Sequence, residues 1–272
     1  MSENPDEEFL HRFGGIARLY GLPGLMQFKN SHVAVIGIGG VGSWAAESLA
    51  RSGIGHISLF DLDDVCVSNI NRQIHAMQNT VGRMKVDVMA ERLQLINPQL
   101  QVSAHQSFVT PTNVEKNLNT SFDYVFDATD SVKAKTAIAA HCKRQGIRLI
   151  CCGGAGGQTD PTRIAIADMS RTTQDALLAK VRNNLRRHHD FTRNPKRKFG
   201  ITCVYSTEQL RYPHSDGSIC LEKPDTGGAV KLDCASGFGA VTHLTASFAM
   251  VAVGHILDQL NAKVDLVGEA VD

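Results

Sequence analysis

The sequence has few of the features that mark a secreted, membrane-bound or disulfide-stapled protein. Its first ten residues, MSENPDEEFL, are acidic and lack the basic and apolar regions of a signal peptide. Seven cysteines, an odd number in 272 residues, fit a reducing compartment better than a disulfide framework. The net charge is only +1, and no internal repeat or low-complexity segment interrupts the chain. We therefore expect a cytoplasmic protein with one large core.

The most informative segment runs from residue 33 to residue 63. It begins with VAVIG, which has the continuous apolar character of a buried parallel strand. Gly37-Ile38-Gly39-Gly40-Val41-Gly42 then matches G-x-G-x-x-G, residues 43–51 have helical spacing, and HISLFDLDD places Asp61 and Asp63 at the end of a second strand. Glycines allow close backbone approach to phosphate and a carboxylate meets ribose hydroxyls, so this segment predicts an adenine-nucleotide site with Gly37, Gly39, Gly40, Gly42, Asp61 and Asp63 as contacts.

Strand and helix patterns alternate as far as residue 152. We expect helices at residues 81–96 and 131–145 and strands at residues 102–108 and 148–152, with a further strand in FDYVFDATDS at residues 122–131. This alternation predicts an α/β fold with a Rossmann-like, mostly parallel sheet and flanking helices. We divide residues 1–272, taken as a single domain, into an N-terminal helical arm (1–30), a nucleotide-binding half (31–152) and a substrate half (153–272).

Charged and polar residues after the second strand distinguish a triphosphate from a dinucleotide. Asn69, Arg72 and Gln73 place polar donors just past the ribose acid, and Lys85 lies near the start of the next predicted helix. Arg and Lys together suit phosphate oxygens that carry several negative charges. A nicotinamide-dependent oxidoreductase, the alternative from another class, would leave these residues unexplained.

A second strand that ends in acidic residues also supports a triphosphate ligand. FDYVFDATDS places Asp127 and Asp130 at the carboxyl end of a strand, where open α/β sheets form their ligand crevice. A carboxylate beside a triphosphate is useful when a cation lies between them, so Asp130 is predicted to hold Mg²⁺. Ser131, which follows it, joins the predicted nucleotide contacts.

Taken together, these motifs resemble the ThiF/MoeB family of adenylating enzymes. The resemblance rests on the glycine turn, Asp61-Leu62-Asp63, residues 68–73 (SNINRQ), the Val81-Gly82-x-x-Lys85 helix start, INP at 96–98 and DATD at 127–130. It implies an ATP-dependent ligase-type reaction through an acyl-adenylate, with Arg72, Lys85 and Asp130 as catalytic residues. It also implies a homodimer in which an N-terminal arginine acts across the interface; here Arg12 and Arg18 are the candidates, because the usual Arg-x-x-Arg reads Arg12-x-x-Gly15.

Further motifs are similar to a branch of the family that dehydrates threonylcarbamoyladenosine in tRNA. They are RFGGIARLYG at 12–21, GGAGGQ at 153–158, YPHSDG at 212–217 and DCASGFG at 233–239. This likeness implies tRNA as a substrate, cysteine-desulfurase or sulfur-acceptor proteins as partners, and a monovalent cation, K⁺ or Na⁺, beside Mg²⁺. Many relatives carry two Cys-x-x-Cys pairs around zinc; this chain has no such pair, which argues against zinc. Adenylation of the C-terminal glycine of a small sulfur-carrier protein remains the alternative within the family.

Several segments of the second half stay open to interpretation. Residues 171–200 hold nine Lys and Arg against two Asp, which favours a polyanion-binding surface with a helix followed by a mobile loop that lacks apolar neighbours. Residues 237–257 are apolar, yet their histidines and small polar residues favour a core helix over a membrane span. The run at 153–157 is either a second anion-binding turn or a tight entry into the next lobe. Cys234 is a candidate nucleophile with no neighbouring base in the sequence.

Overall fold

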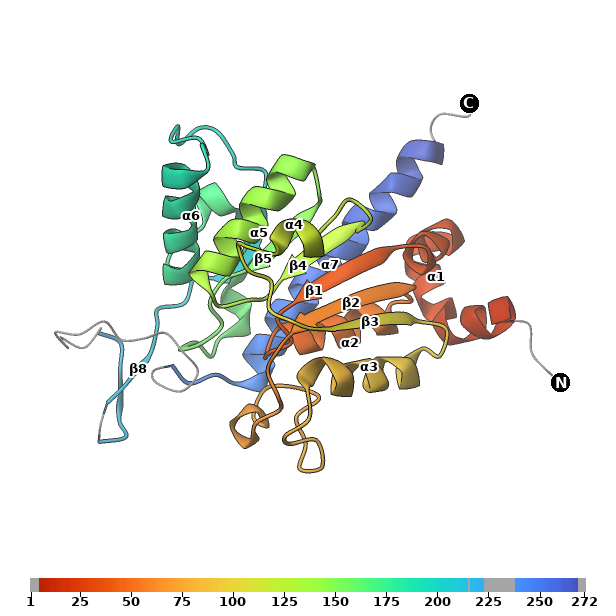
Figure 1. The fold of residues 1–272 in the computed structure, drawn as a ribbon, viewed down its shortest axis with the longest axis horizontal. Coiled ribbons are helices and arrows are strands. Elements are labelled where there is room, and N and C mark those ends of the chain that lie inside the picture. The colour runs from red at the N-terminus through yellow and green to blue at the C-terminus, as the bar shows by residue number, and fades with distance from the viewer. Residues whose placement is uncertain (1–4, 215, 223–237, 269–272) are drawn as a thin grey trace.

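A seven-stranded sheet runs through the molecule in the order β3-β2-β1-β4-β5-β7-β6 (Figure 1). This computed structural model describes residues 5–214, 216–222 and 238–268. The strands are β1 His32–Ile36, β2 His56–Asp61, β3 Gln101–Gln106, β4 Tyr124–Asp127, β5 Leu149–Cys152, β6 Ile164–Asp168 and β7 Thr202–Ser206. All neighbouring strands pair in parallel except β6, which runs antiparallel to β7. The predicted mostly parallel sheet is confirmed.

Helices cover both faces of the sheet. They are α1 Pro5–Lys29, α2 Gly42–Arg51, α3 Lys85–Ile96, α4 Val114–Asn117, α5 Val132–Gln145, α6 Ala176–His188 and α7 Thr242–Gly268. Helices α1, α2, α3 and α7 pack on one face, and α4, α5 and α6 on the other (Figure 1). Alternate residues of β1 serve the two cores: Val33 and Val35 belong to the first, Ala34 and Ile36 to the second. Burial on both faces explains why this strand is apolar throughout.

Most element bounds agree with the sequence pattern to within two residues. Three helices differ more: the one expected at 81–96 begins at Lys85, α6 begins at Ala176, and α7 runs from Thr242 to Gly268 rather than from 237 to 257. Residues 81–84 instead form a turn in which Gly82 has a positive φ of 84° and its N–H donates to the carbonyl of Val65. Lys85 is therefore the first residue of α3, at its positive end, rather than one turn inside the helix.

The first and last described helices, α1 and α7, pack against the same face of the sheet. Helix α1, the predicted arm, is kinked at Gly21, where φ is 74°. The predicted C-terminal helix is confirmed as part of the core and extends further than expected: Leu244, Phe248 and Ile256 of α7 are fully buried. No helix within the described residues is long and apolar enough to cross a membrane.

A small two-stranded sheet stands apart from the main one. Its strands are β8 Tyr212–Pro213 and β9 Ile219–Cys220, and they pair antiparallel. Short 3-10 turns at η1 Val67–Asn69, η2 Pro161–Arg163 and η3 Met169–Arg171 connect the larger elements.

Candidate active site

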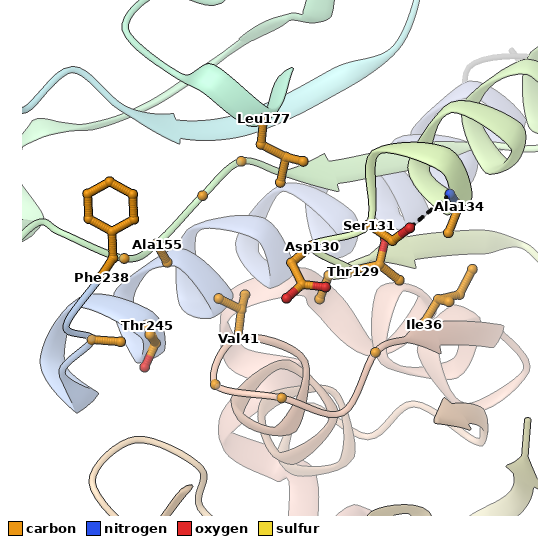
Figure 2. A pocket seen from close by; sticks show the side chains of 18 of the residues that line it. Ile36, Val41, Thr129, Asp130, Ser131, Ala134, Ala155, Leu177, Phe238 and Thr245 are labelled. Atoms are coloured by element: carbon orange, nitrogen blue, oxygen red, sulfur yellow. Dashed lines mark hydrogen bonds between the residues drawn. The ribbon is translucent and has the colours of Figure 1, made fainter. Parts of the chain in front are cut away.

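A cleft of about 1140 Å³ opens at the carboxyl ends of β1 and β4, where the strand order reverses. Ligands of open α/β sheets bind at this position because the connecting loops diverge to opposite faces. The glycine turn after β1 borders one side, and the start of α5, the start of α6 and the run at 153–156 border the others. Figure 2 shows Asp130 midway along the cleft, between Ile36 at one end and Phe238 at the other.

The glycine turn depends on two glycines for its shape. Gly37 has a positive φ of 85°, which favours glycine, and a Cβ on Gly42 would lie 1.8 Å from the carbonyl oxygen of Gly37. Gly39 and Gly40 line the cleft, and a Cβ on Gly39 would meet no atom within 4 Å. Gly42 does not line the cleft. The turn therefore presents Gly37, Gly39 and Gly40 to the cleft, while the positive φ of Gly37 and the missing Cβ of Gly42 allow it to form.

Asp61 holds this turn in place from the end of β2. Its carboxylate accepts N–H hydrogen bonds from Ile38 at 2.6 Å and from Asp63 at 2.9 Å. The residue is 5% exposed, and burial raises the pKa of its carboxyl group although both hydrogen bonds lower it. Both oxygens are thus engaged by the backbone. The next acid, Asp63, has a side chain that is 54% exposed.

Two basic side chains lie along the same border of the cleft. The ammonium group of Lys85 is 2.9 Å from the carboxylate of Asp63. The guanidinium group of Arg72 donates to the carbonyl of Ser68 and to the side chain of Asn71, both at 2.9 Å. Within the described residues Arg72 forms no ion pair, so its charge is available to an anionic ligand.

Two polar residues of the same loop behave differently. Gln73 lines the cleft, is 5% exposed, and its amide oxygen has no hydrogen-bond partner among the described residues. Asn69 does not line the cleft; its side-chain oxygen accepts the N–H of Cys66 at 3.0 Å and caps the turn η1. The structure therefore places Asn69 in a contact within the loop and outside the lining of the cleft.

The end of β4 supplies the remaining predicted residues. The carboxylate of Asp130 is exposed toward the cleft (Figure 2) and makes no hydrogen bond within the described part of the chain. The hydroxyl of Ser131 accepts the N–H of Ala134 at 3.3 Å and caps α5. No group of three or more His, Cys, Asp or Glu that could hold a metal occurs among the residues that the structure describes. A single free carboxylate fits Mg²⁺, which binds through one or two carboxylates together with nucleotide phosphates.

The sequence pattern did not predict a buried ion pair that lies beneath the cleft. The ammonium group of Lys135 is 3.0 Å from the carboxylate of Asp127, and both side chains are fully buried. Asp127 also accepts hydrogen bonds from the N–H and the hydroxyl of Thr129, the residue before Asp130. The sequence does contain one indication of this pair, because Lys135 lies among alanines and an isoleucine on the buried face of α5.

The run at 153–157 forms a tight entry into the second half of the chain. The N–H of Gly154 donates to the carboxylate of Asp175, and the N–H groups of Gly153 and Gly157 donate to backbone carbonyls. Asp175 also caps α6 by accepting the N–H of Leu178. Three of the five N–H groups are thus already satisfied, which favours the tight-entry interpretation over an anion-binding turn.

The basic segment at 171–200 begins at the cleft and continues away from it. Lys180 lines the cleft, whereas the basic side chains further along α6 and in the loop to residue 200 do not. None of the nine basic side chains forms an ion pair with another described residue. The expectation that this loop lacks apolar neighbours is wrong: Phe199 is buried, its ring packs against Phe191, and the guanidinium of Arg186 lies over it.

The two candidate arginines of the N-terminal arm lie away from the cleft. Arg12 pairs with Glu8 and donates to the carbonyl of Ile96, which ties α1 to α3. Arg18 is exposed and has no hydrogen bond or ion pair within the described residues. Cys234 lies outside the residues that the structure describes.

Comparisons with known proteins agree with this fold. The family model described as "ThiF family" matches residues 15–269. The chain is 51% identical to the tRNA threonylcarbamoyladenosine dehydratase of Escherichia coli K12 over 97% of its own length and 98% of the relative's. It is 49% identical to the enzyme of the same name from Haemophilus influenzae, covering 94% of this chain and 96% of that one.

Solved structures with the same fold also match nearly the whole chain. A structure described as TcdA (CsdL) superposes with a TM-score of 0.86 and 49% identity, covering 94% of this chain and 96% of that chain. The E. coli TcdA structure in complex with ATP superposes with a TM-score of 0.83 and 47% identity over the same shares. The family match spans nearly the whole chain, and the fold and sequence relatives agree with it; the chain belongs to the ThiF family.

Proposed function

We propose that this protein catalyses the ATP-dependent dehydration of N6-threonylcarbamoyladenosine in tRNA, closing its side chain into a ring and releasing AMP and pyrophosphate. The observation that carries this proposal is the cleft itself, with Arg72, Lys85 and Asp130 gathered at the sheet's switch point beside a glycine turn. The proposal is supported by two relatives about half identical over almost their full lengths, both named for that reaction.

ATP would bind with its adenosine against the glycine turn. Asp63 is the better ribose contact, because it is half exposed while both oxygens of Asp61 are engaged by backbone N–H groups. Arg72 and Lys85 would hold the phosphates through charge-assisted hydrogen bonds. The free carboxylate of Asp130 would hold Mg²⁺, whose charge would offset that of the triphosphate.

The reaction then proceeds in two steps. The threonyl carboxylate attacks the α-phosphorus of ATP and expels pyrophosphate, which gives an acyl-adenylate. An atom of the carbamoyl group of the same side chain attacks the activated carbonyl, loses a proton and expels AMP. The nucleophile of the second step is tethered to its electrophile, so the protein mainly has to position the groups and stabilise charge.

The assembly and surroundings are part of the same proposal. A homodimer would let a partner's Arg18 reach the nucleotide, and Arg18 is the better candidate because Arg12 is engaged in the α1–α3 contact. Sedimentation of the active enzyme checks the dimer: a fully active monomer at nanomolar concentration contradicts it. A monovalent cation, cysteine-desulfurase or sulfur-acceptor partners and a cytoplasmic location are further expectations.

Mass spectrometry of tRNA nucleosides tests the reaction directly. Threonylcarbamoyladenosine-containing tRNA incubated with enzyme, ATP and Mg²⁺ should yield a nucleoside lighter by one water, with one AMP released per conversion. The same tRNA with NAD in place of ATP should not react. ATP–pyrophosphate exchange that depends on a sulfur-carrier protein and not on tRNA would overturn the proposal in favour of carrier adenylation.

A further inference from the structure

Gln158 is a buried amide that lines the cleft. It is 3% exposed, and its side-chain oxygen has no hydrogen-bond partner among the described residues. A buried polar atom that loses its hydrogen bond to water and forms none within the protein destabilises the fold, so such atoms are rare in proteins. An unpaired acceptor at the border of a ligand cleft is explained when the ligand supplies the missing donor.

The backbone on both sides of Gln158 is fixed. Before it, Gly157 donates to the carbonyl of Gly239 and accepts from the N–H of Arg211, both at 2.8 Å. After it, Thr159 donates its N–H to the carboxylate of Glu208 at 2.9 Å, and its carbonyl is hydrogen-bonded by a ring nitrogen of His243 at 2.8 Å. Four contacts from distant parts of the chain therefore hold this position, as expected for a side chain that is presented to a ligand.

The neighbourhood of Gln158 differs from the nucleotide end of the cleft. Phe238, Ala155 and Thr245 gather at one end, with Asp130 between them and Ile36 (Figure 2). Phe238 packs closely on the glycine run, since a Cβ on Gly157 would lie 2.7 Å from its ring. Phe238 and Ala155 carry no charge and suit an uncharged part of a ligand, whereas Thr245 adjoins Gly40 and Arg72, the residue assigned to the phosphates.

We propose that Gln158 recognises the carbamoyl group of the substrate, pairing its amide with the N–H and C=O of that urea-like unit. The inference rests on the proposed function and deepens it by naming the substrate contact. An amide carries one acceptor and two donors, and rotation of its plane exchanges their places, so it can pair with such an edge in either orientation. The base that carries the group lies against Phe238, and the threonyl carboxylate points toward Asp130 and the nucleotide.

The substitution Gln158→Met tests this, because methionine has a similar length and no hydrogen-bonding amide. The affinity of tRNA is measured for threonylcarbamoylated tRNA and for the same tRNA without the modification, in the absence of nucleotide. The native enzyme should prefer the modified tRNA, and Gln158→Met should reduce that preference about tenfold or more, with affinity for unmodified tRNA unchanged. Turnover of modified tRNA should fall by a similar factor.

Two measurements separate recognition from a structural role. The melting temperature of Gln158→Met should equal or exceed that of the native protein, because the substitution removes a buried oxygen that has no partner in the described fold. ATP affinity should stay within about twofold. Gln73→Met, the same change at the unpaired amide beside Arg72, should instead weaken ATP binding, and Gln145→Met, at an exposed position on α5, should alter neither ligand.

The outcomes distinguish this inference from the proposed function. A native enzyme that does not convert the modified tRNA refutes the function and the inference with it. A native enzyme that converts it, with an unchanged tRNA preference in Gln158→Met, refutes the inference alone. A lowered melting temperature with equal decreases in affinity for modified and unmodified tRNA would make Gln158 a packing residue and refute the inference too.

Discussion

Lys135 and Asp127 form an ion pair of 3.0 Å in which neither side chain is exposed. Burial lowers the pKa of Lys135, yet the facing Asp127 carboxylate and its hydrogen bond raise it above its ordinary value, so the lysine keeps its charge. The same carboxylate fixes Thr129, the residue before Asp130. The pair thus connects the interior of α5 to the loop that carries a predicted catalytic residue.

Removing one partner of this pair should strongly destabilise the protein. Lys135→Met leaves the Asp127 carboxylate buried without its counter-ion, and we expect the free energy of unfolding to fall by about 3–5 kcal/mol. Denaturant titration measures this. Arg144→Met, which breaks the exposed Arg144–Glu115 pair, should cost less than about 1 kcal/mol. The double variant Lys135→Met/Asp127→Leu should regain stability and remain inactive; equal destabilisation by Lys135→Met and Arg144→Met would contradict this account.

Asp130→Ala should abolish ATP-dependent turnover and leave the fold unchanged. Its carboxylate makes no hydrogen bond within the described residues, so stability should not fall, whereas Mg²⁺ loses its protein ligand. Turnover at increasing Mg²⁺ and the melting temperature are the two measurements, with Glu115→Ala as the surface control. Retained activity with a normal Mg²⁺ dependence would rule out this role for Asp130.

Arg72→Ala and Lys85→Ala should each lower kcat/KM for ATP on the order of 10²-fold or more, because each removes a charge from the phosphates in the transition state. Arg83→Ala is the matched control: its guanidinium pairs with Glu91 on the surface. A decrease for Arg83→Ala as large as for Arg72→Ala would show that the effect is not specific to the cleft.

Neutralising Arg193, Lys196, Arg197 and Lys198 together should raise KM for tRNA and flatten its dependence on salt. For each phosphate that the protein no longer neutralises, the slope of log affinity against log salt should decrease by about 0.7–0.9. ATP affinity should be unaffected, since none of these residues lines the cleft. The control variant neutralises Arg51, Arg83 and Lys116, exposed basic residues elsewhere. Weakened ATP binding with unchanged tRNA binding would place the loop in the nucleotide pocket.

The stability of the protein should fall in mild acid partly because of His75. This residue is fully buried, neither ring nitrogen has a hydrogen-bond partner in the described part of the chain, and burial lowers its pKa from 6.5 to about 4. The unfolded chain binds a proton first as the pH falls, so the contribution is complete above about pH 6.5 and disappears progressively between about pH 6.5 and 4. Unfolding free energies measured across this range should fall less steeply in His75→Leu. An unchanged slope would exclude His75 as a contributor.

The local sequence pattern determined most of the secondary structure in the nucleotide-binding half, residues 31–152. The apolar run of β1, the glycine turn and the acids after β2 are all contiguous, so a parallel strand, a tight turn and a helix start follow from backbone sterics and hydrophobic periodicity. Helix α5 lies within one residue of its expected bounds, 131–145, because Ser131 caps its start and the left-handed Gly146 ends it. Arg72, Lys85 and Asp130 were predicted to meet because parallel strands end at one edge of a sheet.

Only the tertiary structure decided which hydrogen bonds and ion pairs the buried polar groups form. Asp61 and Asp63 are two residues apart and equally acidic in sequence, yet the first is engaged by backbone N–H groups and the second remains half exposed. Lys135 meets Asp127 across a strand and a helix, and the side-chain oxygen of Gln158 is buried without a partner among the described residues. Burial and the positions of distant donors set the charge and hydrogen bonding of such groups, and neither can be read from neighbouring residues.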